Sequence, residues 1–172
     1  MYRIATVCTG NICRSPMAEV ALRRAFQNAK LADHVAVDSA GISDEELGNP
    51  IDPRAQRLLE RVGLDPHGHS AQTFDTEWFS NHDLVLAMDV QHHRALTSMA
   101  PDDQARAKVR MYRSFDPAVA AEAIESQGIA DPWYGDAAGF EDTWEMISEA
   151  LPGIVGHVRD QLDRGNPTGS ED

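Results

Sequence analysis

The sequence predicts an α/β fold: a single domain with a central four-stranded parallel sheet, helices on both faces and a Rossmann-like arrangement. Two observations support this prediction. Short apolar runs alternate along the chain with segments of helical periodicity, which is the order typical of a parallel sheet flanked by helices. The chain also has 172 residues, 42% of them apolar and 25% charged, which suits one domain with a real core.

The first strand is predicted over residues 2–7, a short apolar run that contains β-branched side chains. Turn-forming residues end this run, and a helix follows to about residue 28, because apolar side chains recur there at helical spacing. Ser15 suits the N-cap of that helix, and Pro16 suits its first position. The chain is therefore expected to turn from strand to helix within residues 8–15.

The second strand is predicted over residues 35–38 and ends at the turn of residues 39–41. Residues 42–53 are polar and rich in turn formers, so we expect a long loop there. A helix over residues 53–62 follows and is closed by Gly63.

The second half of the chain supplies the remaining elements. Residues 84–88 are the clearest buried strand, residues 90–99 have a helical pattern, and residues 108–112 resemble a strand. Residues 139–162 are predicted to form a long helix, bent or divided at Pro152-Gly153. No shift in composition divides the chain, so we expect one domain over residues 1–164. A disordered tail of Gly, Pro, Ser and acidic residues is expected over residues 165–172.

Composition and charge exclude several classes of function. The net charge of −13 argues against binding to nucleic acid or to an anionic membrane, because either polyanion would be repelled. No apolar run approaches the roughly 20 residues of a membrane span. The N-terminus lacks the apolar stretch of a signal peptide, so we expect a cytoplasmic protein, although export without a signal peptide stays open. The charge is uneven, with +4 on residues 1–30 and −17 on the rest.

Residues 8–15, Cys-Thr-Gly-Asn-Ile-Cys-Arg-Ser, form the loop after the first predicted strand. Ligands of parallel α/β sheets bind beyond the carboxyl ends of the strands, so this loop is the candidate site. A loop before a helix can point several backbone N–H groups inward and hold an anion. Gly10 and Asn11 accept the positive φ that such a curl requires. Arg14 adds a planar fork of donors suited to two phosphate oxygens.

Cys8, at the start of this loop, is the candidate nucleophile. The helix N-terminus and the neighbouring cation favour a thiolate there, and the Ser15 hydroxyl can donate a hydrogen bond to its sulfur. A nucleophile beneath a ring of phosphate donors suits attack on phosphorus. A lone cysteine at a strand end is usually a buried small side chain, and Ser15-Pro16 alone is an ordinary helix start. The combined pattern nevertheless favours the functional interpretation.

Residues 7–19, Val-Cys-Thr-Gly-Asn-Ile-Cys-Arg-Ser-Pro-Met-Ala-Glu, resemble the phosphate-loop signature of the low-molecular-weight protein tyrosine phosphatases. The resemblance spans most of the chain. It recurs in Asp38-Ser39-Ala40-Gly41, Asp52-Pro53-Arg54-Ala55, Ala87-Met88-Asp89 and Asp131-Pro132-Trp133-Tyr134-Gly135-Asp136. Residues 109–117 look like the actinobacterial branch of the family.

This resemblance implies hydrolysis of phosphotyrosine in proteins through a phosphocysteine intermediate, without a metal or a cofactor. Cys8 would be the nucleophile, Arg14 the phosphate clamp and Asp131 the general acid and base. The rest of the loop would bind the phosphate through Thr9, Gly10, Asn11, Ile12, Cys13 and Ser15. Ser39 and His69 would join Asn11 in a network that supports the loop. The expected partner is a phosphotyrosine-containing protein, and we expect a monomer.

Asp131 is a weaker candidate than Cys8 from the residues alone, because Asp-Pro occurs four times and usually marks a turn. The aromatic pair that follows distinguishes it, since Trp133 and Tyr134 could form a wall against a phenyl ring. Without the resemblance, ordinary packing would be the better interpretation of both rings. Tyr134 is also a candidate for phosphorylation.

Cys13 is either simply buried or, as the resemblance implies, the partner of Cys8 in a disulfide that protects the nucleophile from irreversible oxidation. The two cysteines of the chain cannot build a disulfide framework for the fold. The histidines at positions 67 and 69 and at 92 and 93 lack the spacing of metal ligands, so no metal site is expected.

The sequence departs from the family pattern in two places. Glu45 stands where the family often has an aromatic wall of the cleft, and Gln72 stands where the family commonly has Arg. The substrate preference is therefore open, and the acidic rim is expected to disfavour acidic phosphopeptides.

Three alternative functions remain at this stage. Arsenate reductases share the loop but relay electrons through further cysteines, which this chain lacks. Protein-arginine phosphatases carry Thr at the position of Ile12, whose apolar side chain favours a phenyl ester. A non-catalytic phosphotyrosine-binding module would need neither Cys8 nor Asp131.

Overall fold

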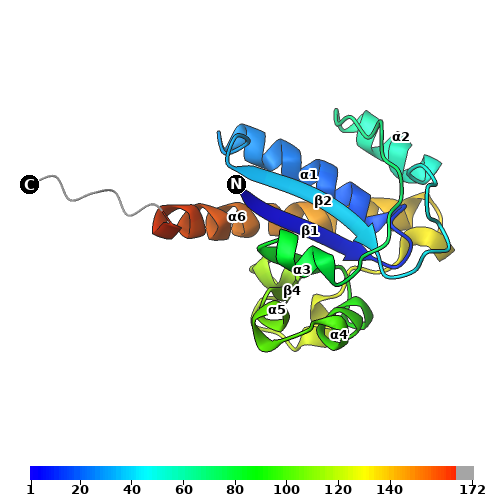
Figure 1. Cartoon of the computed structure of the whole chain (residues 1–172). Helices are drawn as coiled ribbons and strands as arrows, with labels where there is room; N and C mark the ends of the chain where they lie inside the picture. The colour runs from blue at the N-terminus through cyan, green and yellow to red at the C-terminus, as the bar shows by residue number, and fades with distance from the viewer. Residues whose placement is uncertain (166–172) are drawn as a thin grey trace, which may run out of the picture.

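Four parallel strands form the central sheet, in the order β2-β1-β3-β4. Figure 1 labels β2, β1 and β4 among them. They are β1 (Tyr2–Cys8), β2 (Val35–Gly41), β3 (Leu84–Ala87) and β4 (Val109–Met111). The structure is a computed structural model and describes residues 1–165. The predicted α/β class with a four-stranded parallel sheet is confirmed.

Strand β1 lies inside the sheet. It pairs with β2 from Tyr2↔Val35 to Cys8↔Gly41, and with β3 from Ile4↔Leu84 to Val7↔Ala87. Residues 4–8 of β1 and all of β3 are buried. Burial from both sides explains why these strands are continuous apolar runs rather than alternating patterns.

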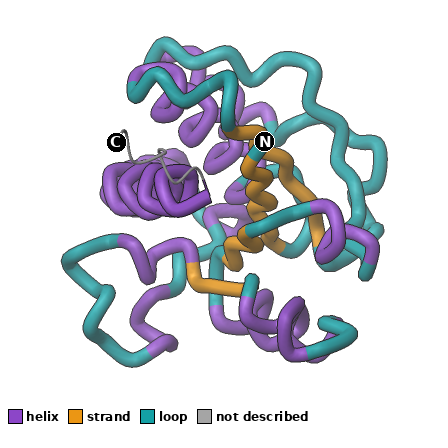
Figure 2. The backbone as a smooth tube through the Cα atoms, turned by 60° about the vertical axis from the view of Figure 1, so that its left-hand side comes forward, coloured by secondary structure: helices purple, strands orange, loops and turns teal. Residues whose placement is uncertain are grey.

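Helices cover both faces of the sheet, as predicted. On one face lie α1 (Arg14–Asn28), α2 (Pro53–Arg61) and α6 (Ala137–Gly165), packed against inward side chains such as Ile4 and Leu86. On the other face lie α3 (Glu77–Asn81), α4 (Val90–Met99) and α5 (Asp103–Ala107), packed against Ala5 and Val85. Figure 2 shows the strands between these two groups of helices.

The carboxyl end of β1 lies where the chain changes direction across the sheet. From β1 the chain first passes through α1 to β2 on one side, and it later crosses to β3 on the other side. A crevice forms at such a switch point, beyond the carboxyl ends of the strands. Residues 8–14, which we call the phosphate loop, begin at this point.

Helix α1 begins at Arg14 with Cys13 as its N-cap residue, so the prediction of Ser15 as N-cap was wrong. The backbone N–H of Met17 donates to the Cys13 carbonyl at 3.1 Å, which starts the helix two residues earlier than expected. Pro16 is therefore the third helical residue and not the first. Pro16 removes no hydrogen bond from the helix at this position, because the first four N–H groups of a helix have no acceptor within it.

Helix α6 runs from Ala137 to Gly165 with Pro152 inside it, so of the two predicted alternatives, a bend or a division at Pro152-Gly153, the division does not occur. Gly153, the next residue, lets α6 approach a neighbouring backbone. A Cβ on Gly153 would lie 2.1 Å from the Phe115 carbonyl oxygen. Gly165, predicted to begin the tail, is the last residue of α6, and residues 166–172 lie outside the described residues.

Several short elements escaped the sequence analysis. Helices α3 and α5 have five residues each, too few for a helical period to be visible. Three 3-10 helices were also missed: η1 (Tyr112–Phe115), η2 (Ile124–Gln127) and η3 (Pro132–Tyr134). Residue 112, predicted as strand, is the first residue of η1. Among residues 1–165, no helix combines the length and apolar character that crossing a membrane requires.

Candidate active site

The phosphate loop is held from outside by the end of β2. The N–H groups of Ile42 and Ser43 donate to the carbonyls of Cys8 and Thr9 at 3.0 and 2.9 Å. Gly41 lies so close that a Cβ there would be 2.7 Å from the Thr9 carbonyl oxygen. Within the described part of the chain, no protein acceptor takes a hydrogen bond from the N–H groups of residues 9–13. These donors are therefore available to an anion.

Cys8 is buried at the start of the phosphate loop, with 3% of its surface exposed, and its sulfur faces Ser15. The Cys8 Sγ lies 3.0 Å from the Ser15 Oγ, which accepts a hydrogen bond from the Asn11 amide at 2.9 Å. The Ser15 hydroxyl hydrogen is thus free to point at the sulfur, since its other acceptor, the Ala40 carbonyl, is 3.4 Å away. A hydroxyl donor at this distance stabilises a thiolate.

Asn11 fixes the curl of the phosphate loop with a left-handed backbone, φ 59°, and a fully buried side chain. Its Nδ2 donates to Ser15 and to Ser39, each at 2.9 Å, and its Oδ1 accepts from the Gln72 N–H at 2.9 Å. The His69 Nε2 lies 2.6 Å from the Asn11 carbonyl oxygen. The structure therefore places Ser39 and His69 against Asn11 and adds Gln72 to the same network.

This network continues away from the phosphate loop through Glu19 on α1. The Ser39 hydroxyl donates to the Glu19 carboxylate, which is also paired with Arg23 at 2.5 Å. Arg23 in turn donates to the Val37 carbonyl on β2 at 2.8 and 3.1 Å. Two charged side chains of α1, Glu19 and Arg23, therefore help to hold this helix to β2.

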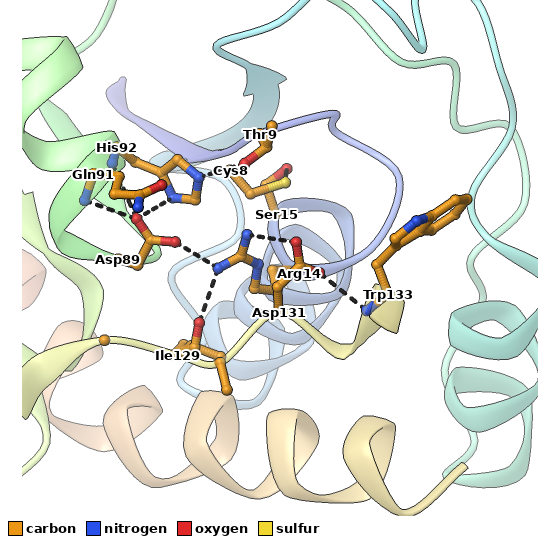
Figure 3. A network of polar contacts seen from close by, with 12 residues as sticks. Cys8, Thr9, Arg14, Ser15, Asp89, Gln91, His92, Ile129, Asp131 and Trp133 are labelled. Carbon is orange, nitrogen blue, oxygen red and sulfur yellow. Dashed lines mark hydrogen bonds and ion pairs between the residues drawn. The ribbon is translucent and has the colours of Figure 1, made fainter. Parts of the chain in front are cut away.

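Arg14, 3% exposed, is held from behind by two acceptors (Figure 3). Its Nη1 donates to the Asp89 Oδ2 at 2.8 Å and to the Ile129 carbonyl at 2.9 Å. Asp89 is itself held as the N-cap of α4, where its Oδ1 accepts from the N–H groups of Gln91 and His92. Burial alone would raise the pKa of Asp89, but His92 and Arg14 together bring it below its usual range.

His92 touches the phosphate loop although sequence analysis gave it no role. Its Nε2 lies 2.8 Å from the Thr9 Oγ1, and its Nδ1 lies 3.3 Å from the Asp89 Oδ1. Burial lowers the pKa of His92 to about 4, so the ring is neutral near pH 7. No local signal reveals this contact, because His92 and Thr9 are 83 positions apart.

Asp131 meets the phosphate loop from the other end of the chain. It is the N-cap of η3, where its Oδ1 accepts from the Trp133 N–H at 3.0 Å. Its Oδ2 lies 3.3 Å from the Arg14 Nη2, as Figure 3 shows, and a third of its side chain is exposed. The carboxyl is thus placed beside the phosphate loop and open to solvent, as a group that exchanges protons with a substrate must be.

A cleft with a volume of about 120 Å³ joins these groups. Its floor is formed by phosphate-loop residues and its rim by two segments, residues 43–46 and 131–134. Trp133 and Tyr134 stand on the rim with 43% and 88% of their surface exposed. Glu45 and Glu46 also line the cleft, so its rim is acidic. The lining residues are Cys8, Thr9, Gly10, Ile12, Cys13, Arg14, Ser43, Glu45, Glu46, Asp131, Trp133 and Tyr134.

Cys13 lines the same cleft and is buried, and both cysteines are present as free thiols. Burial, followed by the nearby Asp52 carboxylate, raises the pKa of Cys13 far above its usual value, so its thiol keeps its proton. The Cys13 thiol is therefore poorly suited to act as a nucleophile. Among residues 1–165, no three His, Cys, Asp or Glu side chains gather in a way that could hold a metal ion.

Comparisons with known proteins show that this chain is similar to protein tyrosine phosphatases of low molecular weight. The family model described as low molecular weight phosphotyrosine protein phosphatase matches residues 3–164. A low molecular weight protein-tyrosine-phosphatase of Streptomyces coelicolor is 44% identical, over 94% of this chain and 96% of the relative. The low molecular weight protein-tyrosine phosphatase A of Mycobacterium bovis is 39% identical, over 96% of both chains. A crystal structure of a protein tyrosine phosphatase from Entamoeba histolytica superimposes with a TM-score of 0.86 at 25% identity, covering 94% of this chain and 99% of that one.

Proposed function

The chain belongs to the low molecular weight phosphotyrosine protein phosphatase family and is a low molecular weight protein-tyrosine-phosphatase, and we propose that Cys8, Arg14 and Asp131 carry out its reaction. The observation that supports these roles is the convergence of the three side chains on one cleft. A sulfur with a hydroxyl donor, a guanidinium fixed from behind and an accessible carboxyl are the groups that phosphoryl transfer to a thiolate requires.

In the first step the Cys8 thiolate attacks phosphorus, so an S–P bond forms and the bond from phosphorus to the phenolic oxygen breaks. Asp131, in its acid form, gives its proton to the departing oxygen, and the products are phosphocysteine and the tyrosine side chain. Ser15 stabilises the thiolate before attack through its hydroxyl, 3.0 Å from the sulfur.

In the second step a water molecule attacks phosphorus and the S–P bond breaks. Asp131, now a carboxylate, takes a proton from this water, and inorganic phosphate leaves. The thiolate and the protonated carboxyl are both restored, so the cycle closes with protein groups alone.

The phosphoryl oxygens are held in both steps by the same donors. The free N–H groups of residues 9–13 and the outer edge of Arg14 supply positive potential where charge develops. Asp89 and the Ile129 carbonyl hold the inner nitrogen of Arg14, so little reorganisation is needed during the reaction.

The residues that line the cleft favour phosphotyrosine in proteins as the substrate. Ile12 offers an apolar floor, and Trp133 and Tyr134 offer ring surface at the rim, where a phenyl ester would lie. Glu45 and Glu46 are expected to disfavour substrates with acidic residues beside the phosphotyrosine.

We also propose that oxidation of Cys8 by a peroxide leads to a disulfide with Cys13 in the same cleft, which protects the nucleophile. The exposed Tyr134 is a proposed target of phosphorylation. The enzyme is proposed to act as a cytoplasmic monomer.

Hydrolysis of phosphotyrosine, phosphoserine and phosphoarginine peptides, measured in the presence of a chelator, tests this proposal. We expect phosphotyrosine to be preferred and the chelator to have no effect. Cys8→Ser is expected to be inactive and Asp131→Ala strongly impaired. A preference for phosphoarginine would contradict the proposal that Ile12 favours a phenyl ester. Full activity of Cys8→Ser would contradict the assignment of Cys8 as the nucleophile.

A further inference from the structure

Arg54, the third residue of the Asp52-Pro53-Arg54 motif, connects the start of α2 to the segment that carries Asp131. Its Nε and Nη2 donate to the two oxygens of Asp52 at 3.1 and 3.0 Å. Its Nη1 reaches the carbonyl oxygens of Trp133 and Gly135, each at 3.4 Å. One guanidinium therefore contacts a carbonyl within the η3 turn that follows Asp131 and the carbonyl of its C-cap residue.

The same guanidinium lies close to two aromatic rings. Its Cζ lies 4.7 Å from the centre of the Phe140 ring on α6 and 5.4 Å from the centre of the Trp133 ring. Both distances are within the range of cation–π attraction. Arg54 thus contacts Trp133 through both its carbonyl and its ring.

Asp52 anchors this connection to the phosphate loop. Its side chain is 4% exposed, and its backbone N–H donates to the Ile12 carbonyl at 2.9 Å. The Asp52 carboxylate also caps α2 by accepting from the Arg54 N–H at 2.8 Å. A continuous path of hydrogen bonds therefore runs from the phosphate loop, through Asp52 and Arg54, to residues 133–135.

Residues 131–135 need such a connection because they make few other contacts with the residues that line the cleft. Trp133 and Tyr134 are exposed, and the ion pair of Asp131 with Arg14 is 3.3 Å long. The general acid must stay within hydrogen-bond reach of the leaving oxygen while Arg14 binds the phosphoryl group. A second contact that does not involve Arg14 can supply this constraint.

We propose that Arg54 is a positioning residue, which fixes residues 131–135 to the phosphate loop so that Asp131 meets the leaving oxygen. This inference rests on the proposed role of Asp131 as general acid. The planar fork of arginine is required, because a lysine ammonium could not bind both oxygens of Asp52 and reach two carbonyls at once.

The dependence of kcat/KM on the leaving group tests this proposal. Phenyl phosphate has a leaving group that needs a proton, whereas 4-nitrophenyl phosphate needs one much less. Asp131→Asn supplies the reference pattern, a loss that is much larger for phenyl phosphate. Because a misplacement of about 1 Å can cost about a hundredfold, Arg54→Ala should lose about ten- to a hundredfold on phenyl phosphate. Its loss on 4-nitrophenyl phosphate should be severalfold smaller.

Two further variants separate position from charge. Arg54→Lys keeps the charge near the cleft, and we expect the KM for 4-nitrophenyl phosphate to stay normal while the loss on phenyl phosphate persists. Arg57→Ala is the matched control, since Arg57 lies exposed on the same helix outside the cleft, and its activity on both substrates should equal that of the wild type. Thermal melting of each variant reports whether it is folded.

The double variant Asp131→Asn/Arg54→Ala should lose no more on phenyl phosphate than Asp131→Asn alone. An equal loss on both substrates in Arg54→Ala, or full rescue by Arg54→Lys, would overturn the positioning role while leaving the proposed function intact. An Asp131→Asn variant without leaving-group dependence would overturn the acid role, and the inference with it.

Discussion

Asn11 offers the sharpest test of how the phosphate loop is stabilised. Replacement by alanine removes two donated hydrogen bonds and one accepted one from a fully buried side chain, with partners at 2.9 Å. At about 1 kcal/mol net for each bond, this costs about 3 kcal/mol. Alanine at φ 59° adds about 1 kcal/mol of backbone strain. Asn11→Ala should therefore lose about 4 kcal/mol, a large part of the 5–15 kcal/mol of an average domain.

Asn11→Gly separates the two contributions. It loses the same hydrogen bonds but tolerates the left-handed backbone, so it should be about 1 kcal/mol more stable than Asn11→Ala. Both variants should also lose catalytic rate at saturating substrate. Without the amide donor, the Ser15 hydroxyl is free to turn from the Cys8 sulfur to the Ala40 carbonyl.

Urea unfolding followed by circular dichroism measures the stability of both variants, and kcat for an aryl phosphate measures the second effect. An Asn11→Ala variant that unfolds at the urea concentration of the wild type would refute this reasoning. So would a glycine variant less stable than the alanine variant, because the backbone would then not need a residue that accepts positive φ.

Four further outcomes follow from the structure. Gly41→Ala should lower kcat far more than stability, because a Cβ would lie 2.7 Å from the backbone of the phosphate loop; normal kcat would contradict this. Gly153→Ala should lower the free energy of unfolding by about 3 kcal/mol, measured in urea, because its Cβ would meet the Phe115 carbonyl oxygen at 2.1 Å, and KM should not change. His92 has a pKa of about 4 when folded and about 6.5 when unfolded, so the unfolded state binds the proton first and stability falls as pH decreases between these values, by up to about 3 kcal/mol. His92→Gln should weaken this dependence of stability on pH, measured by urea unfolding at several pH values. An unchanged dependence would contradict the assignment of this effect to His92. Glu45→Gln should raise kcat/KM for phosphotyrosine peptides with acidic neighbours relative to those with basic neighbours, an effect that weakens with salt; equal changes for both peptides would argue against an acidic rim.

The sheet and the phosphate loop were predictable because their signals are local. Buried strands such as β3 are apolar runs, and the strand-to-helix turn at residues 8–14 carries its own chemistry in consecutive residues. Asn11 could be recognised as a residue that accepts a left-handed backbone, and its φ of 59° agrees. The start of α1 was misplaced because Ser15, a good N-cap residue, uses its hydroxyl for the Cys8 sulfur instead.

Ser39 and His69 were expected from the family resemblance to support the phosphate loop, and both contact Asn11. Other supports of the site were not predicted, because they join residues far apart in the sequence. Arg14 meets Asp89 across 75 positions, and Thr9 meets His92 across 83. Arg54 and the Trp133 carbonyl are 79 positions apart. Arg14 and Thr9 belong to the predicted phosphate loop, and Asp89 and Arg54 to motifs of the family resemblance. Their pairing was not visible in the sequence, because the fold alone brings these partners together.

Detection of a phosphorylated cysteine during turnover tests the central role of Cys8 most directly. The wild-type enzyme would be mixed with phenyl phosphate, quenched in acid within the first turnovers, and digested for mass spectrometry. We expect one phosphoryl group on the peptide that contains Cys8, its loss on longer incubation without substrate, and none in Cys8→Ser. A phosphoryl group on another residue, or rapid turnover with no phosphorylated Cys8 under conditions that preserve phosphocysteine, would contradict the proposed mechanism.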